Sequence, residues 1–271
     1  MTPDGTQVAV HVDEGDGNTD TWIYDIQRRT LTLLTFDGDN SVPVWSPDGE
    51  RVAFSSGRSG SYDLMWKRAD GGGDAEVLLR QDNGQFPISF SRDGRVLAFY
   101  EVHPFTKRDI WVLPLEGDRT PIPFLVTPAN ERAPMFSPDG RWLAYVSDES
   151  GRDETYVQSY PGPGGKQQIS PDGGTEPLWA HTGRELFYRV GNKVMVVDIE
   201  PGSEFKAGAP RELFEGAFLM STPVFAYPRW DISSDGKRFL MVMSEPAPAP
   251  SRLSVVFNWF EELAQLAPGQ R

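Results

Sequence analysis

Three histidines are the candidate general bases of this 271-residue chain: His11, His103 and His181. His103 lies in the segment Glu101–Asp109, between two expected strands. A serine from elsewhere could complete a hydrolytic triad there, because triads are defined in space rather than in sequence order. The chain has no Gly-x-Ser-x-Gly motif, and the sequence favours a solvated loop histidine. A hydrolase of the esterase or peptidase type is therefore the alternative function, with His103 as its candidate catalytic residue.

Oxygen-bearing side chains are dense in one early segment, as a Ca²⁺ site would require. The candidate ligands are Asp13, Asp16, Asn18 and Asp20. The segment lacks the order of an EF-hand loop and has no glutamate at the twelfth position. A solvated acidic hairpin loop is the alternative, and the sequence favours it. We therefore expect no resident cofactor, with Ca²⁺ as the other possibility.

The composition argues against several classes of function. The chain has no cysteine, which excludes disulfides, thiolate catalysis and cysteine-ligated zinc. Its net charge is −13 and no basic patch is visible, so we expect no nucleic-acid partner. There is no run of about 18 apolar residues, so we expect no direct membrane insertion.

A strand–turn–strand unit with the turn Ser-Pro-Asp-Gly recurs along the chain. In this turn, proline presets the first central dihedral angle and glycine takes the position that needs a positive φ. The full copies are Thr2–Gly5, Ser46–Gly49, Ser91–Gly94 and Ser137–Gly140, and the degenerate ones are Ala180–Gly183 and Ser233–Gly236. Six copies spaced 43 to 53 residues apart suit four strands per unit. The sequence therefore predicts an all-β, six-bladed β-propeller of four-stranded antiparallel blades.

We expect a single domain over residues 1–271. The predicted blades are residues 1–41, 42–85, 86–132, 133–175, 176–228 and 229–271. The first and last are incomplete, since the first lacks an innermost strand and the last lacks a fourth. An unpaired strand at Leu253–Trp259 would expose a backbone edge, through which the chain could form a homo-oligomer. A capping box at Asn258–Glu261 predicts a short C-terminal helix.

The starts of the inner strands carry polar residues that converge on the axis of a propeller. These residues are Asn40, Gln85, Glu131, Arg132 and Glu176. Because ligand sites of propellers are concave and often axial, we predict that they bind a peptide, protein or small ligand at one mouth of the channel. Mutual pairing of charges at a crowded axis is the alternative. The apolar segment Ala217–Pro228 is either an exposed interaction patch or, as we favour, a loop that folds back over the ring.

The repeated core, Ser-Pro-Asp-Gly-x-x-Leu-Ala-Phe, resembles WD40-like (PD40), TolB-type propeller repeats. Several segments also resemble the C-terminal propeller regions of bacterial serine/threonine-kinase-associated sensor proteins: Phe36–Gly38, Pro43–Gly49, Asp109–Leu115, Tyr160–Lys166 and Asn258–Leu263. The resemblance implies a six-bladed propeller on the extracytoplasmic, periplasmic side of a bacterial membrane protein. The chain has no His-Arg-Asp or Asp-Phe-Gly motif, so kinase activity does not carry over. The predicted function is a non-catalytic recognition or scaffold module.

Overall fold

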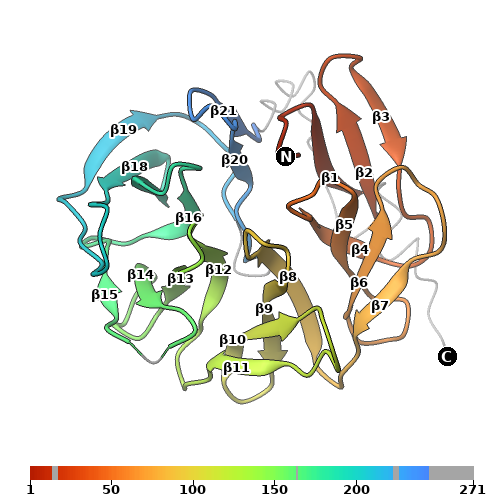
Figure 1. The fold of residues 1–271 in the computed structure, drawn as a ribbon, viewed down its shortest axis with the longest axis horizontal. Helices are drawn as coiled ribbons and strands as arrows, with labels where there is room; N and C mark the ends of the chain where they lie inside the picture. The colour runs from red at the N-terminus through yellow and green to blue at the C-terminus, as the bar shows by residue number, and fades with distance from the viewer. Residues whose placement is uncertain (14–17, 163, 222–225, 244–271) are drawn as a thin grey trace, which may run out of the picture.

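The regular structure of the chain consists of β-strands arranged radially around one axis. The computed structural model describes residues 1–13, 18–162, 164–221 and 226–243, and every regular element in these ranges is a strand. The inner strands gather at the centre and the outer strands lie at the periphery (Figure 1). Four sheets have four strands, the first has three and the last, partial one has two. The predicted all-β propeller with four-stranded antiparallel blades is confirmed, as five blades and a partial sheet.

Within each blade the strands follow one another in chain order. Blade one contains β1 (Gln7–Asp13), β2 (Thr19–Asp25) and β3 (Thr30–Leu33). Blade two contains β4 (Asn40–Trp45), β5 (Arg51–Ser56), β6 (Asp63–Arg68) and β7 (Glu76–Leu79). Blade three contains β8 (Gly84–Phe90), β9 (Val96–His103), β10 (Lys107–Pro114) and β11 (Ile122–Leu125).

The remaining blades repeat this order. Blade four contains β12 (Arg132–Phe136), β13 (Trp142–Ser147), β14 (Glu154–Ser159) and β15 (Gln167–Gln168). Blade five contains β16 (Thr175–Trp179), β17 (Glu185–Val190), β18 (Lys193–Asp198) and β19 (Arg211–Glu215). The partial sheet contains β20 (Trp230–Ile232) and β21 (Phe239–Met241).

The turn between the first two strands of a unit is fixed by its own side chains. In blade four, Ser137 Oγ donates to Asp139 Oδ1 at 2.7 Å and accepts from the Trp142 amide at 3.0 Å. The Gly140 amide donates to the Ser137 carbonyl at 2.9 Å, and Gly140 has a φ of 71°, which suits glycine best. The same hydroxyl–carboxylate bond occurs in the turns that begin at Thr2, Ser46, Ser91 and Ser233. The repeat therefore encodes a preorganised turn.

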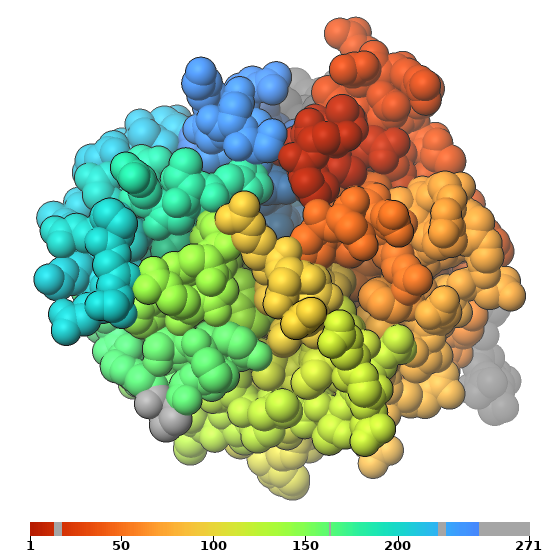
Figure 2. Space-filling model, in the orientation of Figure 1, coloured from red at the N-terminus to blue at the C-terminus, as the bar shows by residue number. Residues whose placement is uncertain are grey.

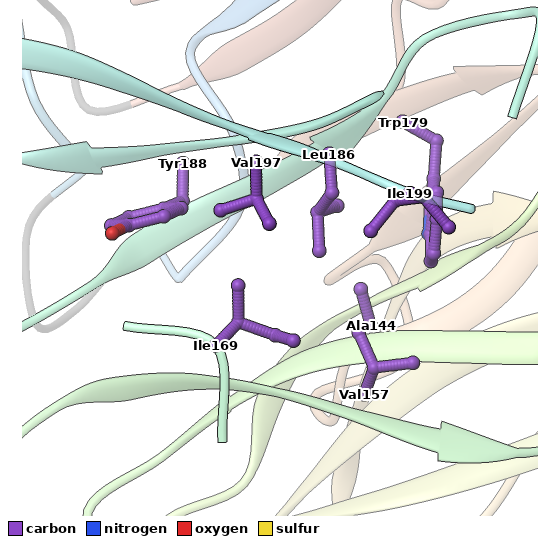
Figure 3. Close-up of a cluster of buried hydrophobic side chains, with 8 residues drawn as sticks. All are labelled: Ala144, Val157, Ile169, Trp179, Leu186, Tyr188, Val197 and Ile199. Carbon is purple, nitrogen blue, oxygen red and sulfur yellow. The ribbon is translucent and has the colours of Figure 1, made fainter. Parts of the chain in front are cut away.

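Each blade is buried on both faces against its neighbours. On β13, Leu143 and Tyr145 pack against blade three, whereas Ala144 packs against blade five. Figure 3 shows the second of these interfaces, in which blade-four and blade-five side chains interlock: Ala144, Val157, Ile169, Trp179, Leu186, Tyr188, Val197 and Ile199. Equivalent clusters lie between blades one and two, between blades two and three, and between blade five and the partial sheet. Both faces of this strand are therefore buried.

The first blade and the partial last sheet lie side by side. The N-terminal amine pairs with Asp231 Oδ2 at 2.6 Å. A Cβ atom placed on Gly5 would lie 3.8 Å from Ser234 Oγ, so the first and last turns are also neighbours. In Figure 2 the red segment accordingly lies beside the blue one. The first blade and the partial last sheet therefore come together at the end of the axis where the turns lie.

Some predicted features lie outside the described residues. These are the strand Leu253–Trp259, with the homo-oligomer edge that it would form, and the helix that begins near Asn258. Blade one has three strands, as predicted, with β1 pairing only with β2 among the described residues. Within the described ranges, no helix is long and apolar enough to cross a membrane.

The packing between blades predicts the cost of a cavity there. Leu186 is fully buried between blades four and five. We expect Leu186→Ala to lower the free energy of unfolding by about 2–5 kcal/mol, because the cluster loses contacts and cannot fully collapse. The control is Leu213→Ala on β19 of the same blade, where the side chain is 39% exposed and the change should stay within about 0.5 kcal/mol. Urea unfolding of both variants checks this, and equal losses would contradict inter-blade packing.

Candidate functional site

A cavity of about 600 Å³ lies where the inner strands end at the axis. The final residues of these strands and the turns that follow them form its wall. The strand-derived lining is mostly apolar and includes Val44, Trp45, Met135, Phe136, Leu178 and Trp179. The volume is within the usual range of ligand pockets, about 300–1,000 Å³. The geometry thus provides a concave, apolar site at the turn end of the axis.

The segment just before β20 lies at the axis and forms the bottom of this cavity. Ala226 and Tyr227 are buried at the axis against Val42, Ile88 and Tyr100, which come from blades two and three. Tyr227 and Pro228 also line the cavity. Burial raises the pKa of Tyr227 to about 12, so this side chain stays neutral. We call Ala226–Pro228 the channel floor.

The rest of the loop is held by buried charged groups. Arg189 Nη1 donates to the Leu219 carbonyl at 3.0 Å. The Glu176 carboxylate accepts from the amides of Ser221 and Arg229 at 2.8 and 3.0 Å. The described parts of this loop therefore fold back onto the ring, as favoured from the sequence; they are Ala217–Ser221 and Ala226–Pro228. Val224 and Phe225 of the same loop lie outside the described residues.

The five predicted ligand-binding residues lie away from the cavity. Asn40, Gln85, Glu131, Arg132 and Glu176 belong to the start of the inner strands, and none lines the cavity. All five are buried, and none is more than 8% exposed. No hydrogen bond joins any two of them in the described part of the chain. The sequence predicted a ligand site at the end where the inner strands begin, because it shows that these residues are polar but not that their side chains are buried.

Each of these residues bonds to its own surroundings. Asn40 Nδ2 donates to Asp20 Oδ1 at 3.1 Å, and Gln85 Nε2 donates to the Asn83 carbonyl. Arg132 Nη2 donates to Asp153 Oδ2, and Thr127 Oγ1 donates to Glu131 Oε1. Buried atoms without a partner in the described residues remain on four of the five: Asn40 Oδ1, Gln85 Oε1, Glu131 Oε2 and Arg132 Nη1. Such atoms normally bind water or a ligand, so a role for these residues in binding stays a prediction.

The histidines do not form a hydrolytic site with the described residues. His103 Nδ1 accepts from the amides of Phe105 and Thr106 at 3.3 and 3.4 Å, which makes it a local turn acceptor. His11 lies 2.9 Å from the Tyr227 hydroxyl through Nε2, and its pKa is lowered by burial and then by the nearby charge of Arg229. His181 is exposed at the cavity, where its Nε2 lies 3.3 Å from the Ile232 carbonyl.

The candidate Ca²⁺ ligands are only partly within the described residues. Asp13 and Asn18 are exposed, whereas Asp16 lies outside the described ranges. Asp20 Oδ1 accepts from Thr35 Oγ1 at 2.8 Å, in addition to Asn40. Among the described residues no group of three or more acidic or histidine side chains is placed to hold a metal ion.

Sequence reasoning missed the apolar lining of the cavity. Val44, Ser89, Met135 and Leu178 occupy equivalent places, two residues before the first residue of each turn. An apolar residue stands at this place in blades two, four and five, whereas the partial sheet has Asp231 there; this pattern was a signal that could have been read. Polar residues attracted attention instead, because ligand sites are usually recognised by their polar groups.

Comparisons with known proteins bear on the fold. No protein-family model matches the chain. A protein named Tol-Pal system protein TolB, from Helicobacter pylori, is 26% identical over 152 residues, which is 55% of this chain and 36% of that protein. The chain thus spans about a third of the length of the curated relatives it matches.

Solved structures give a longer match. TolB from Acinetobacter baumannii has a TM-score of 0.70 at 17% identity, over 89% of this chain and 59% of that one. An oligogalacturonate lyase from Vibrio parahaemolyticus has a TM-score of 0.61 at 12% identity, over 93% of this chain and 71% of that one. At such identities the likeness shows the fold alone. The chain is a TolB-like β-propeller, and its function must be argued from its own site.

Burial of Glu131 predicts a pH dependence of stability. Burial raises the pKa of Glu131 from 4.5 to about 7; the hydrogen bond from Thr127 opposes this rise and the charge of Asp109 adds to it. Between these two pKa values the folded protein binds more protons at Glu131 than the unfolded chain does. This group therefore makes stability fall as pH rises from about 4.5 to about 7, with no further loss above that range.

Thermal unfolding from pH 4.5 to 8 checks this dependence. We expect Glu131→Gln to remove the part of the slope that this carboxyl causes, since the amide does not titrate. Glu212→Gln is the control, because Glu212 lies on the surface and pairs with Lys193 at 2.7 Å. An unchanged slope in the Glu131 variant would contradict the raised pKa.

Proposed function

We propose that this TolB-like β-propeller is a protein-binding scaffold that holds a peptide segment of a partner in the axial cavity. The observation that carries the proposal is the cavity itself, about 600 Å³, mostly apolar in its strand-derived lining and bounded by residues of the first five turns. A cavity of this size accepts one or two large apolar side chains. In the cavity, the apolar surface of the partner's side chains would be removed from water. Binding would therefore be driven mainly by the hydrophobic effect.

The frame around the cavity supports binding without large rearrangement. Trp45 and Trp179 line the cavity and are only 8% and 5% exposed, so packing fixes them before a ligand arrives. The Trp179 indole nitrogen donates to the Met135 carbonyl at 3.0 Å and ties blade five to blade four. A preorganised wall lowers the entropic cost of binding. The site therefore suits recognition by a rigid scaffold.

The hydrolase alternative receives no support from a specific contact. Among the described residues, His103 accepts hydrogen bonds from two amides of its own loop and lies beside the Phe105 ring, and His181 contacts a backbone carbonyl. Within the part of the chain that the structure describes, neither histidine is hydrogen-bonded to a serine and a carboxylate, as the base of a triad would be. We therefore prefer binding to catalysis.

The wider context is also part of the proposal. We infer a six-bladed ring over residues 1–271, with blades at the boundaries predicted from the sequence. The TolB likeness supports a periplasmic location in a bacterium, and the resemblance to kinase-associated propellers supports a sensor module of a longer membrane protein. In this arrangement the propeller would report binding of its peptide or protein partner to the rest of the protein.

A peptide display experiment with a cavity-blocking variant tests the proposal. We expect a random peptide library displayed on phage to yield binders of the purified chain that carry large apolar side chains. Val44→Arg places a long charged side chain in the cavity and should weaken these binders about tenfold or more, which is about 1.4 kcal/mol.

The matched control is Val77→Arg, on the outer strand of the same blade, where the valine is 41% exposed. It should leave affinity unchanged, and thermal unfolding should show that both variants are folded. Failure to select any peptide, or selected peptides that bind the Val44 variant as tightly as the natural chain, would overturn the proposed function.

A further inference from the structure

The second residues of the first five turns form the rim of the cavity. Five of the six second residues line it: Pro3, Pro47, Arg92, Pro138 and His181. Proline is expected here because it presets the first central dihedral angle of the turn. Arg92 replaces it in blade three, in a turn whose hydrogen bonds match those of the proline-containing copies. Blade three thus lacks the turn-stabilising proline at the cavity rim and has an arginine in its place.

Prolines on the rim also contact the next turn around the ring. A Cβ atom placed on Gly94 would lie 3.8 Å from Pro47 Cδ, and one placed on Gly183 would lie 3.7 Å from Pro138 Cδ. The equivalent position at Gly140, the next turn after Arg92, has no atom within 4 Å. Arg92 therefore does not make the contact with the next turn that Pro47 and Pro138 make.

The charge of Arg92 is not balanced by the described residues. The side chain is exposed and makes no hydrogen bond or ion pair within the described part of the chain. The carboxylates of the neighbouring turns are already bound. Asp48 accepts from Ser46 Oγ at 2.5 Å, and Asp139 accepts from Arg141 Nε at 2.7 Å. A ligand carboxylate would therefore meet a guanidinium group with its donors available.

Arg92 also lies where three hollows meet. It lines the axial cavity, a hollow of about 270 Å³ that runs between the turns of blades four and five, and one of about 470 Å³ between blades two and three. No other residue of the described chain lines all three. A peptide that extends from the cavity into either hollow can contact this side chain.

We propose that Arg92 selects ligands in which a carboxylate lies next to a large apolar side chain. The apolar side chain enters the axial cavity, and the carboxylate accepts two parallel hydrogen bonds from the guanidinium group. The carboxylate can belong to an aspartate or glutamate side chain or to a peptide C-terminus. This inference rests on the proposed function and adds the chemistry of the ligand. Because the chain has a net charge of −13, an acidic ligand is repelled elsewhere, which makes the Arg92 contact selective.

Labelled peptide pools test this selection directly. Each pool consists of fluorescein-labelled hexapeptide amides with a phenylalanine at a fixed position, followed by aspartate, asparagine or lysine, and with the other positions randomised. A fourth pool ends in phenylalanine with a free carboxylate and distinguishes the two sources of the charge. Binding is measured by fluorescence anisotropy. We expect the natural chain to bind the aspartate pool, the free-carboxylate pool or both about tenfold tighter than the asparagine pool.

Substitutions at Arg92 should redirect the preference. Arg92→Pro restores the residue found in three other turns, so the variant should be at least as thermally stable as the natural chain while losing the preference for a carboxylate. Arg92→Glu should favour the lysine pool. Arg28→Glu is the control, because Arg28 is 82% exposed in the turn between β2 and β3, away from the rim. This control should bind like the natural chain.

The outcomes separate this inference from the proposed function. The role of Arg92 is overturned, and the proposed function left intact, if the natural chain binds neither the aspartate pool nor the free-carboxylate pool more tightly than the asparagine pool while Val44→Arg loses binding of all three. A preference for carboxylates that survives in Arg92→Pro would also overturn it. If no pool binds the natural chain, both the proposed function and the selection by Arg92 fail.

Discussion

The whole structure depends on burying two apolar faces of every blade. A sheet that is apolar on both faces cannot stand alone in water, and each blade solves this by packing against the next one. Ala144 and Leu143 are adjacent in sequence but belong to different inter-blade clusters. Only a closed or nearly closed succession of blades satisfies every sheet. The radial arrangement, and with it the axial site, follows from this requirement.

A ring of this kind leaves the inner strands facing one another across the axis. Side chains from the blades and the channel floor fill part of this space, since Tyr227 and Ala226 pack there against blades two and three. The unfilled part lies at the turn end, where the wall is set by residues just before each turn. Because the turns are nearly identical, variation at their second position decides how the rim differs from blade to blade. Arg92 is therefore more informative about the ligand than the turn residues that recur from one repeat unit to the next.

Much of the fold could be predicted from the sequence because its determinants are local. The predicted four-stranded antiparallel blades are present, and the hydrogen bond from the glycine amide closes the turn in all six units. The site could not be predicted in the same way. Contacts between segments far apart in the sequence bury Glu131 and Gln85, and such contacts also hold Ala226 at the axis. Local patterns show that a residue is polar, but they do not show which end of a channel is open.

Strained backbone positions accompany the register shifts of three inner strands, β4, β12 and β16. Val42, Ala133 and Glu176 each have a φ of 53°, although none is glycine, and each precedes a proline. This conformation costs of order 1–2 kcal/mol per residue, so the packing around it must compensate. In β4 the pairing with β5 shifts register between Ser41 and Val44, as an extra residue in a bulge requires. Without that residue, Asn40 and Val44 would share one face of the strand; with it, they lie on opposite faces, so Val44 can line the cavity while Asn40 is buried within the blades.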